Sequence, residues 1–301
     1  MEGMPLPGDP EFFDLVWRKQ PAIYRGHAPS TRLDQIRSDC LVSWARPPAR
    51  ARIFVADETG VPGGSVAREI PSPELASQIY AQFRDQEPVT LLLNHVERTD
   101  VRVRELQQSF RIPYAWRLDN AVATFSTAAS GIGYHAGHED GFIVQVAGIR
   151  RWRVWSKALL SPEYLRYLLR GDTGLPVEPR PSATPLVNCT LLPGDTLYIP
   201  ALFPHEGVTQ EDSISLSLGW KGISTYHALL AIAECPTAGA ALRDDCLELI
   251  PDFLDSAESV AASGNVLRKA FADSGIDIER NSIEAYLWRL AMQAAPCERL
   301  L

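Results

Sequence analysis

The chain has 301 residues, of which 46% are hydrophobic and 22% charged, and its formal net charge is −8. This length predicts one large domain or two smaller ones, and the apolar fraction excludes wholesale disorder. No apolar run approaches the roughly 20 residues of a membrane-spanning helix, and the first residues lack the features of a secretory signal. The acidic balance disfavours nucleic acid as a partner. Five scattered cysteines without a CxxC pair are typical of a cytoplasmic protein with reduced thiols.

Residues 1–115 combine helical and strand patterns. A helix is predicted after Asp9, where a proline follows the capping residue and large apolar side chains recur at helical spacing. A second amphipathic helix is predicted over 72–83, with a serine cap and a proline at its first position. Short strands are predicted over 22–24 and 89–93. We therefore expect an α/β lead-in that packs on the following domain.

The pattern changes to short strands separated by Gly and Pro turns over residues 116–220. Strands are predicted over 121–125, 142–146, 152–155, 196–199 and 213–218. The last of these, SISLSL, alternates polar and apolar residues, as a half-buried strand does. Short strands in this arrangement are typical of a sandwich or a jelly-roll barrel. The predicted fold class is mainly β, with a jelly-roll, cupin-like core.

Residues 221–301 carry helical patterns and almost no strand signal. Their apolar stripes are Leu229, Leu230 and Ile232, and Ala285, Leu287 and Leu290. We expect this helical region to form a homodimer. The alternative is that the helices pack on the barrel of their own chain.

Three histidines lie in two motifs between predicted strands. GIGYHAGHEDGF contains His135 and His138, and LPGDTLYIPALFPHEG contains His205. Two histidines from separate strands of a small barrel, together with a carboxylate, form the facial triad that binds Fe(II) and leaves open positions for a co-substrate and dioxygen. The motifs therefore predict a metal site.

The chain resembles the Jumonji-C, cupin-like oxygenases, in the bacterial branch close to the ribosomal oxygenases. The segments that carry the resemblance are FFDLVWRKQPAIYRG (12–26), DNAVATFS (119–126), GIGYH (131–135), FIVQVAGIRRWRVW (142–155), LLPGDTLYIP (191–200) and FPHEG (203–207). The resemblance covers about residues 10–220. It implies hydroxylation that depends on Fe(II), 2-oxoglutarate and dioxygen. The implied substrate is an amino-acid side chain, a peptide or protein, or a small natural-product intermediate.

The resemblance also assigns roles to individual residues. His135 and His205 match the two metal-binding histidines. Arg150 matches the basic residue that pairs with the distal carboxylate of 2-oxoglutarate, and a guanidinium inside a barrel suits such an anion. Ser126 matches a hydroxyl that helps to hold this carboxylate. Tyr134 borders the metal motif and is a candidate for contact with the substrate.

The chain departs from the family at the third metal ligand, because the usual carboxylate position is Gly137. In one interpretation a β-bulge brings a downstream residue to the metal, with Asp140 as the provisional ligand and His138 or Glu139 as alternatives. In a second, the position stays open for a halide, as the resemblance to iron halogenases implies. In a third, the histidines of both motifs form a three-histidine site. In a fourth, the chain is a non-catalytic, cupin-like binding protein.

Overall fold

The computed structural model describes residues 4–28, 33–34, 36, 40–56, 65–112, 118–137, 139–161, 164, 180–221, 240–241 and 244. The chain divides into two compact units, Met1–Leu160 with Val177–Lys221, and Ser161–Pro176 with Gly222–Leu301. The predicted helices of 221–301 lie almost wholly outside the described residues, so the homodimer and the boundary at residue 221 stay predictions. No helix among the described residues is long and apolar enough to cross a membrane.

Two of the helices begin where the sequence predicts. Helix α1 (Pro10–Leu15) follows Asp9, although the Asp9 carboxylate accepts a hydrogen bond from the Leu6 N–H and not from the helix. Helix α4 (Pro73–Phe83) follows Ser72, whose hydroxyl accepts a hydrogen bond from the Leu75 N–H. Among the described residues, further helices are α3 (Cys40–Trp44) and α5 (Val101–Ser109), with 3₁₀ turns η1 (Val96–Arg98) and η3 (Lys157–Leu159).

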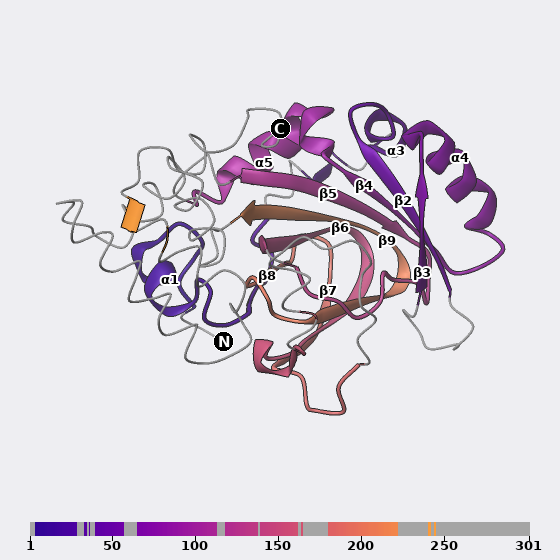
Figure 1. Ribbon diagram of the computed structural model, residues 1–301. Coiled ribbons are helices and arrows are strands. Elements are labelled where there is room, and N and C mark those ends of the chain that lie inside the picture. Colours follow the sequence, from indigo (N-terminus) through magenta and orange to yellow (C-terminus); the bar gives the residue numbers. More distant parts are fainter. Residues whose placement is uncertain are drawn as a thin grey trace. The chain divides into compact units, whose positions relative to one another are not determined.

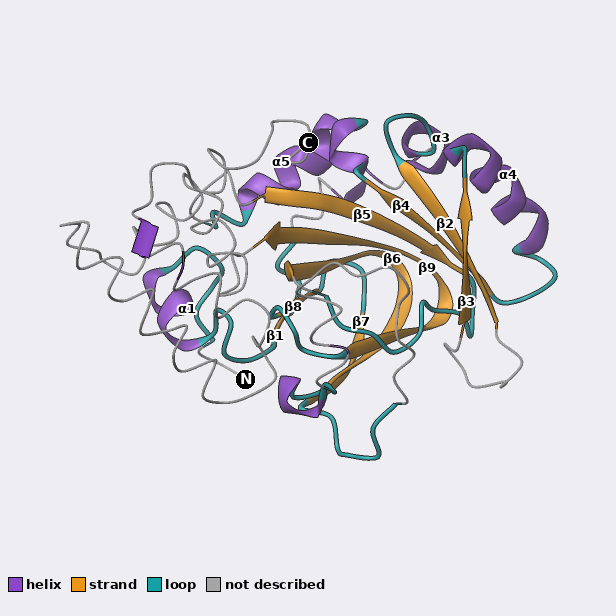
Figure 2. Ribbon diagram, viewed as in Figure 1, coloured by secondary structure: helices purple, strands orange, loops and turns teal. Residues whose placement is uncertain are grey.

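The first unit is built on one antiparallel sheet of nine strands (Figures 1 and 2). The strands are β1 (Ala22–Tyr24), β2 (Arg50–Ala56), β3 (Ser65–Ile70), β4 (Val89–Asn94), β5 (Leu118–Ser126), β6 (Glu139–Val154), β7 (Val187–Leu191), β8 (Thr196–Ile199) and β9 (His205–Lys221). Their order is β1-β8-β6-β9-β5-β4-β2-β3, and β7 also pairs with β6. The predominance of antiparallel strands confirms a mainly β fold. Strands from the N-terminal lead-in form both ends of the sheet, with β1 at one end and β4, β2 and β3 at the other. Helix α4 packs on β2 and β4.

Strands β6 and β9 pair over nearly their whole lengths and curve strongly (Figure 2). The sequence predicts separate strands over 142–146 and 152–155, whereas the structure joins them in β6. The register between β6 and β9 shifts three times between Gln145 and Arg150, which indicates β-bulges that bend the pair. Gly148 lies at this bend with a φ of +67°.

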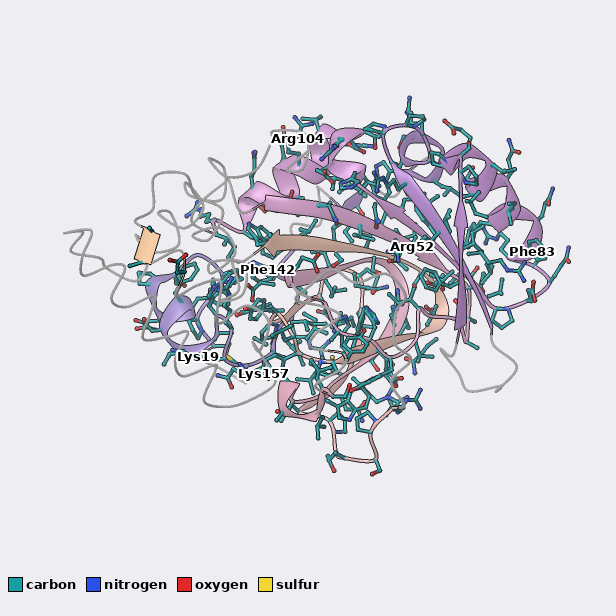
Figure 3. All side chains as sticks on the ribbon, viewed as in Figure 1. Lys19, Arg52, Phe83, Arg104, Phe142 and Lys157 are labelled. Carbon is teal, nitrogen blue, oxygen red and sulfur yellow. The ribbon has the colours of Figure 1, made fainter. Side chains whose placement is uncertain are left out.

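The two faces of the sheet carry different side chains. In the first half of β6, the even-numbered residues Phe142 and Val144 join the larger apolar core, which also contains Phe12 of α1. Phe142 is labelled in Figure 3. The odd-numbered Ile143 faces the opposite way, into a smaller core with Trp152 and other residues of β6 to β8. We call this second face the barrel interior.

Gly148→Ala is expected to destabilise the protein by at least about 2 kcal/mol, because a methyl group cannot be accommodated there. A Cβ at this position would lie 1.9 Å from the backbone oxygen of Asp212. Urea unfolding followed by circular dichroism measures the loss. Gly26→Ala is the matched control, since Gly26 also has positive φ (+59°) but no atom within 4 Å of the added Cβ. Equal losses in both variants would show that backbone strain, and not the contact with Asp212, dominates.

Candidate metal and co-substrate site

The two predicted metal-binding histidines lie opposite each other. The N–H of His135 donates to the carbonyl of His205 over 3.0 Å, and the N–H of His205 donates back over 2.8 Å. The ring centroids are 4.4 Å apart. His205 is the first residue of β9, whereas His135 precedes β6 and makes an isolated β-bridge. The structure thus brings together residues that are 70 positions apart in the sequence.

Backbone contacts orient both imidazoles in the same way. The Nδ1 atom of His135 lies 3.0 Å from the carbonyl oxygen of Gly133, and that of His205 lies 2.9 Å from the carbonyl oxygen of Phe203. Since a carbonyl oxygen only accepts hydrogen bonds, each Nδ1 is the protonated nitrogen, and each Nε2 keeps a lone pair. Histidine ligands in metal sites are held in this way, with the outer nitrogen donating to a carbonyl or carboxylate.

The surroundings keep both rings neutral. Burial is the main cause that lowers the pKa of His205 to about 3, and the neighbouring His135 lowers it further. Burial also lowers the pKa of His135, with smaller contributions from Arg150 and Arg52. Both imidazoles are therefore unprotonated at neutral pH, which is the form that binds a metal ion.

Arg150 is a buried cation without a carboxylate partner among the described residues. The side chain is 1% exposed, whereas the neighbouring Arg151 is exposed. Its Nη1 donates to the Ser215 hydroxyl over 3.3 Å and its Nη2 to the Gly207 carbonyl over 3.2 Å, while Nε has no partner. Burial lowers its pKa to about 10, so the guanidinium stays charged at neutral pH. A buried charge of this kind requires an anion.

The second motif ends in Gly207, and the close packing around this residue leaves no room for a side chain. A Cβ on Gly207 would lie 2.7 Å from Nε of Arg150 and 2.9 Å from the ring of Trp152. The Arg150 guanidinium lies over this ring, with its central carbon 4.9 Å from the centroid. Glycine therefore leaves the space in which the cation and the indole stack.

A set of buried hydroxyl groups surrounds the positions of Ser126 and Ser215. Ser126 is fully buried, and its hydroxyl lies 2.9 Å from that of Thr90, which lies 2.9 Å from that of Ser130. Ser126 pairs with Ser213 on β9, two residues before Ser215. The hydroxyl that contacts Arg150 is thus that of Ser215, and Ser126 lies in the adjoining hydroxyl network.

Arg52 and Ser215 are site residues that sequence reasoning missed. Successive pairings align Arg52 with Leu92, Thr124 and Ser215 across β2, β4, β5 and β9. Directly paired residues in antiparallel strands share a face, so Arg52 lies on the barrel interior (Figure 3). Ser215 could have been found, because SISLSL places small polar residues on one face. Arg52 would have required the prediction of β2.

Tyr134 precedes the first histidine and packs edge-to-face on Trp155, with ring centroids 5.4 Å apart. It is partly exposed. Its side chain therefore lies at the border of the histidine pair, and contact with the substrate stays a prediction.

Asp140, the predicted provisional third ligand, forms hydrogen bonds with residues other than the histidine pair. Its fully buried carboxylate accepts hydrogen bonds from Arg18 Nε at 2.8 Å, the Tyr198 hydroxyl at 2.9 Å and the Ala201 N–H at 3.2 Å. Asp140 pairs with Trp220 in the larger apolar core, on the face opposite the barrel interior. The structure does not bring Asp140 to the histidine pair, because an even-numbered residue at the start of β6 points away from it.

Asp140→Asn is expected to lower the free energy of unfolding by about 1–3 kcal/mol, because it removes the charge that compensates Arg18. Chemical denaturation measures this loss. Arg18 is 31% exposed, so water moderates the effect. Asp85→Asn serves as the control, since its carboxylate is 85% exposed. A stability equal to the parent's would contradict a structural role for the Arg18–Asp140 pair.

The remaining candidates for the third metal ligand, His138 and Glu139, lie where the first histidine motif leads into β6. His138 lies outside the described residues. Glu139 is partly buried, and its Oε2 atom lies 2.9 Å from the position of a Cβ built on Gly137. Among the described residues, no three His, Cys, Asp or Glu side chains already form a group that could hold a metal ion.

Residues 105–229 match the model of the JmjC domain family. The chain is 32% identical over 145 residues to ribosomal protein uL16 3-hydroxylase of Escherichia coli strain K12, a match that covers 48% of this chain and 37% of that protein. It is 27% identical over 133 residues to a probable ribosomal oxygenase of Haemophilus influenzae, covering 43% and 31% of the two chains. The matches thus span about a third of the length of these curated relatives.

Solved structures of a ribosomal oxygenase from Escherichia coli, YcfD, share the fold. The structure of YcfD with cobalt and 2-oxoglutarate has a TM-score of 0.56 and 22% identity, covering 83% of this chain and 68% of YcfD. The structure with cobalt and succinic acid has a TM-score of 0.55 and 22% identity, covering 93% and 69%. This likeness confirms the predicted jelly-roll fold. The family match over residues 105–229 and the shared fold agree that this region is similar to the JmjC domain of the bacterial ribosomal oxygenases.

Proposed function

We propose that this chain is an Fe(II)- and 2-oxoglutarate-dependent oxygenase that hydroxylates a side chain of a ribosomal protein. The observation that carries the proposal is the combination of a neutral histidine pair with a buried, uncompensated arginine. The two Nε2 lone pairs suit a divalent metal, and the Arg150 guanidinium suits the distal carboxylate of an α-keto diacid. The names of the relatives support the same chemistry.

The residues present fit the cofactor and co-substrate. His135 and His205 would hold the metal ion through Nε2, and Arg150 would bind the carboxylate of 2-oxoglutarate with help from Ser215 and the Ser126 network. When bound, Fe(II) supplies the activation of dioxygen that couples oxidation of 2-oxoglutarate to succinate and carbon dioxide with hydroxylation of a C–H bond. The barrel orients these groups and excludes water from them.

A protein substrate agrees with the charge of the chain. The net charge of −8 favours association with a basic partner, and ribosomal proteins are a basic class of protein. The relative from Escherichia coli is named as a hydroxylase of ribosomal protein uL16, so the homologous protein is the first substrate to test. We place the enzyme in the cytoplasm, where ribosomes are assembled.

The test measures succinate formation and the mass of the substrate. The protein is incubated with Fe(II), 2-oxoglutarate, dioxygen, chloride and ribosomal proteins of its own host. Succinate production together with a mass gain of one oxygen atom in one protein supports the proposal. Replacement of hydrogen by chlorine would favour the halogenase, and absence of succinate at every substrate concentration would favour a binding protein.

A further inference from the structure

We infer that Glu139 supplies the third metal ligand, in place of the carboxylate that Gly137 lacks. This inference rests on the proposed function, because it concerns the same metal site. It assigns the ligand set His135, Glu139 and His205. It also predicts the reaction outcome, since a protein carboxylate at this position leaves no place for a halide.

The register of the sheet places Glu139 on the correct face. Glu139 pairs with Lys221, and Gln145 on the same strand pairs with Ser215. Residues 139 and 145 are separated by an even number of positions with no register shift between them, so their side chains share a face. Ser215 accepts a hydrogen bond from Arg150, which identifies this face as the barrel interior.

The reach of the side chain points to the same role. The Glu139 Oε2 atom lies 2.9 Å from where the Cβ of a side chain on residue 137 would be. The carboxylate oxygens of an aspartate lie two bonds from their own Cβ. The Glu139 carboxylate therefore occupies space next to residue 137 that a side chain at this position would need. The absence of a side chain on Gly137 is what leaves room for it.

Ligation requires the Glu139 carboxylate to move toward the two Nε2 atoms when the metal binds. Glutamate has three side-chain torsions, and Glu139 is only partly buried, so the side chain can exchange its present interaction for the metal without a change in the sheet. Asp140 cannot compete, because its carboxylate is held by three hydrogen bonds on the opposite face.

Cobalt(II) binding tests the inference without reliance on turnover. Isothermal titration measures Co(II) affinity in the presence of 2-oxoglutarate, and the visible absorption of bound Co(II) reports its ligand set. We expect Glu139→Ala and Glu139→Gln to weaken binding by at least about 100-fold, the upper end of the effect of losing a supporting group alone. Asp140→Asn is the matched control and is expected to bind Co(II) as the parent does.

A rescue variant separates ligand loss from misfolding. The double variant Gly137→Asp with Glu139→Ala restores a carboxylate to the family's usual position and removes the side chain that would crowd it. Gly137 does not have positive φ, so its backbone accepts aspartate. We expect this variant to recover Co(II) affinity to within about 10-fold of the parent.

The outcomes distinguish the inference from the proposed function. If the parent protein binds neither Co(II) nor 2-oxoglutarate, the proposed function fails, and the inference fails with it. Parent-like binding and absorption in both Glu139 variants would overturn the inference alone. Loss of binding in His138→Ala, with Glu139→Ala unchanged, would assign the third ligand to histidine and also overturn it.

Discussion

Replacement of His205 by alanine is expected to abolish turnover and weaken Co(II) binding by at least about 100-fold. The variant removes one of the two Nε2 donors, and the remaining His135 cannot hold a divalent ion in the facial arrangement. It also exposes a gap beside the indole of Trp152, whose centroid lies 6.0 Å from that of His205. Titration with Co(II) and a succinate assay measure the two effects.

The control for this prediction is His27→Ala. His27 packs between the rings of Tyr24 and Phe110, each with its centroid 5.6 Å away, and is not part of the histidine pair. We expect a moderate loss of stability in this variant with metal binding retained. Retained turnover in His205→Ala would reject the assignment of the metal site.

Arg150→Met is expected to abolish 2-oxoglutarate binding while raising the stability of the ligand-free protein by about 1–3 kcal/mol. The gain follows because methionine fills much of the same space without an uncompensated buried charge. The loss follows because no other cation in the described residues hydrogen-bonds the Ser215 hydroxyl. Thermal unfolding with and without 2-oxoglutarate measures both effects, since a bound ligand raises the melting temperature.

Two variants sharpen this result. Arg151→Met changes the neighbouring, exposed arginine, which donates to Asn188, and should leave 2-oxoglutarate binding intact. Arg150→Lys keeps the charge but loses the planar fork that binds a carboxylate with two hydrogen bonds, so intermediate affinity is expected. An Arg150→Met protein that still gains thermal stability from 2-oxoglutarate would place the co-substrate elsewhere.

The sequence predicted those helices and strands whose formation depends on interactions between neighbouring residues. The Ser72 cap of α4 and strands such as Thr196–Ile199 are set by neighbouring residues, and both are confirmed. Strand β2 was missed because Arg50 and Arg52 interrupt its apolar pattern, and the sequence does not reveal that a barrel interior accommodates Arg52. The joining of two predicted strands into β6 depends on bulges at Gly148, which periodicity cannot detect.

The site residues that lie in recognisable sequence motifs could be predicted from the sequence. Family motifs indicated His135, His205 and Arg150, and the structure brings the two histidines together and buries the arginine. Asp140 was chosen for its spacing, but its partner Arg18 is 122 residues away, and no local pattern reveals such a contact. The third ligand depends on which face of β6 a residue occupies, and this follows only from the register.

The reciprocal backbone hydrogen bonds between His135 and His205 give the site an internal reporter. Each of these two amide protons can exchange with solvent only when the bridge between the histidine segments opens, so their deuterium uptake measures how often the site comes apart. A bound divalent ion joins the same two residues through their rings, and opening would then also require its release. Metal loading should therefore appear as slower exchange at these two amides, with no substrate present.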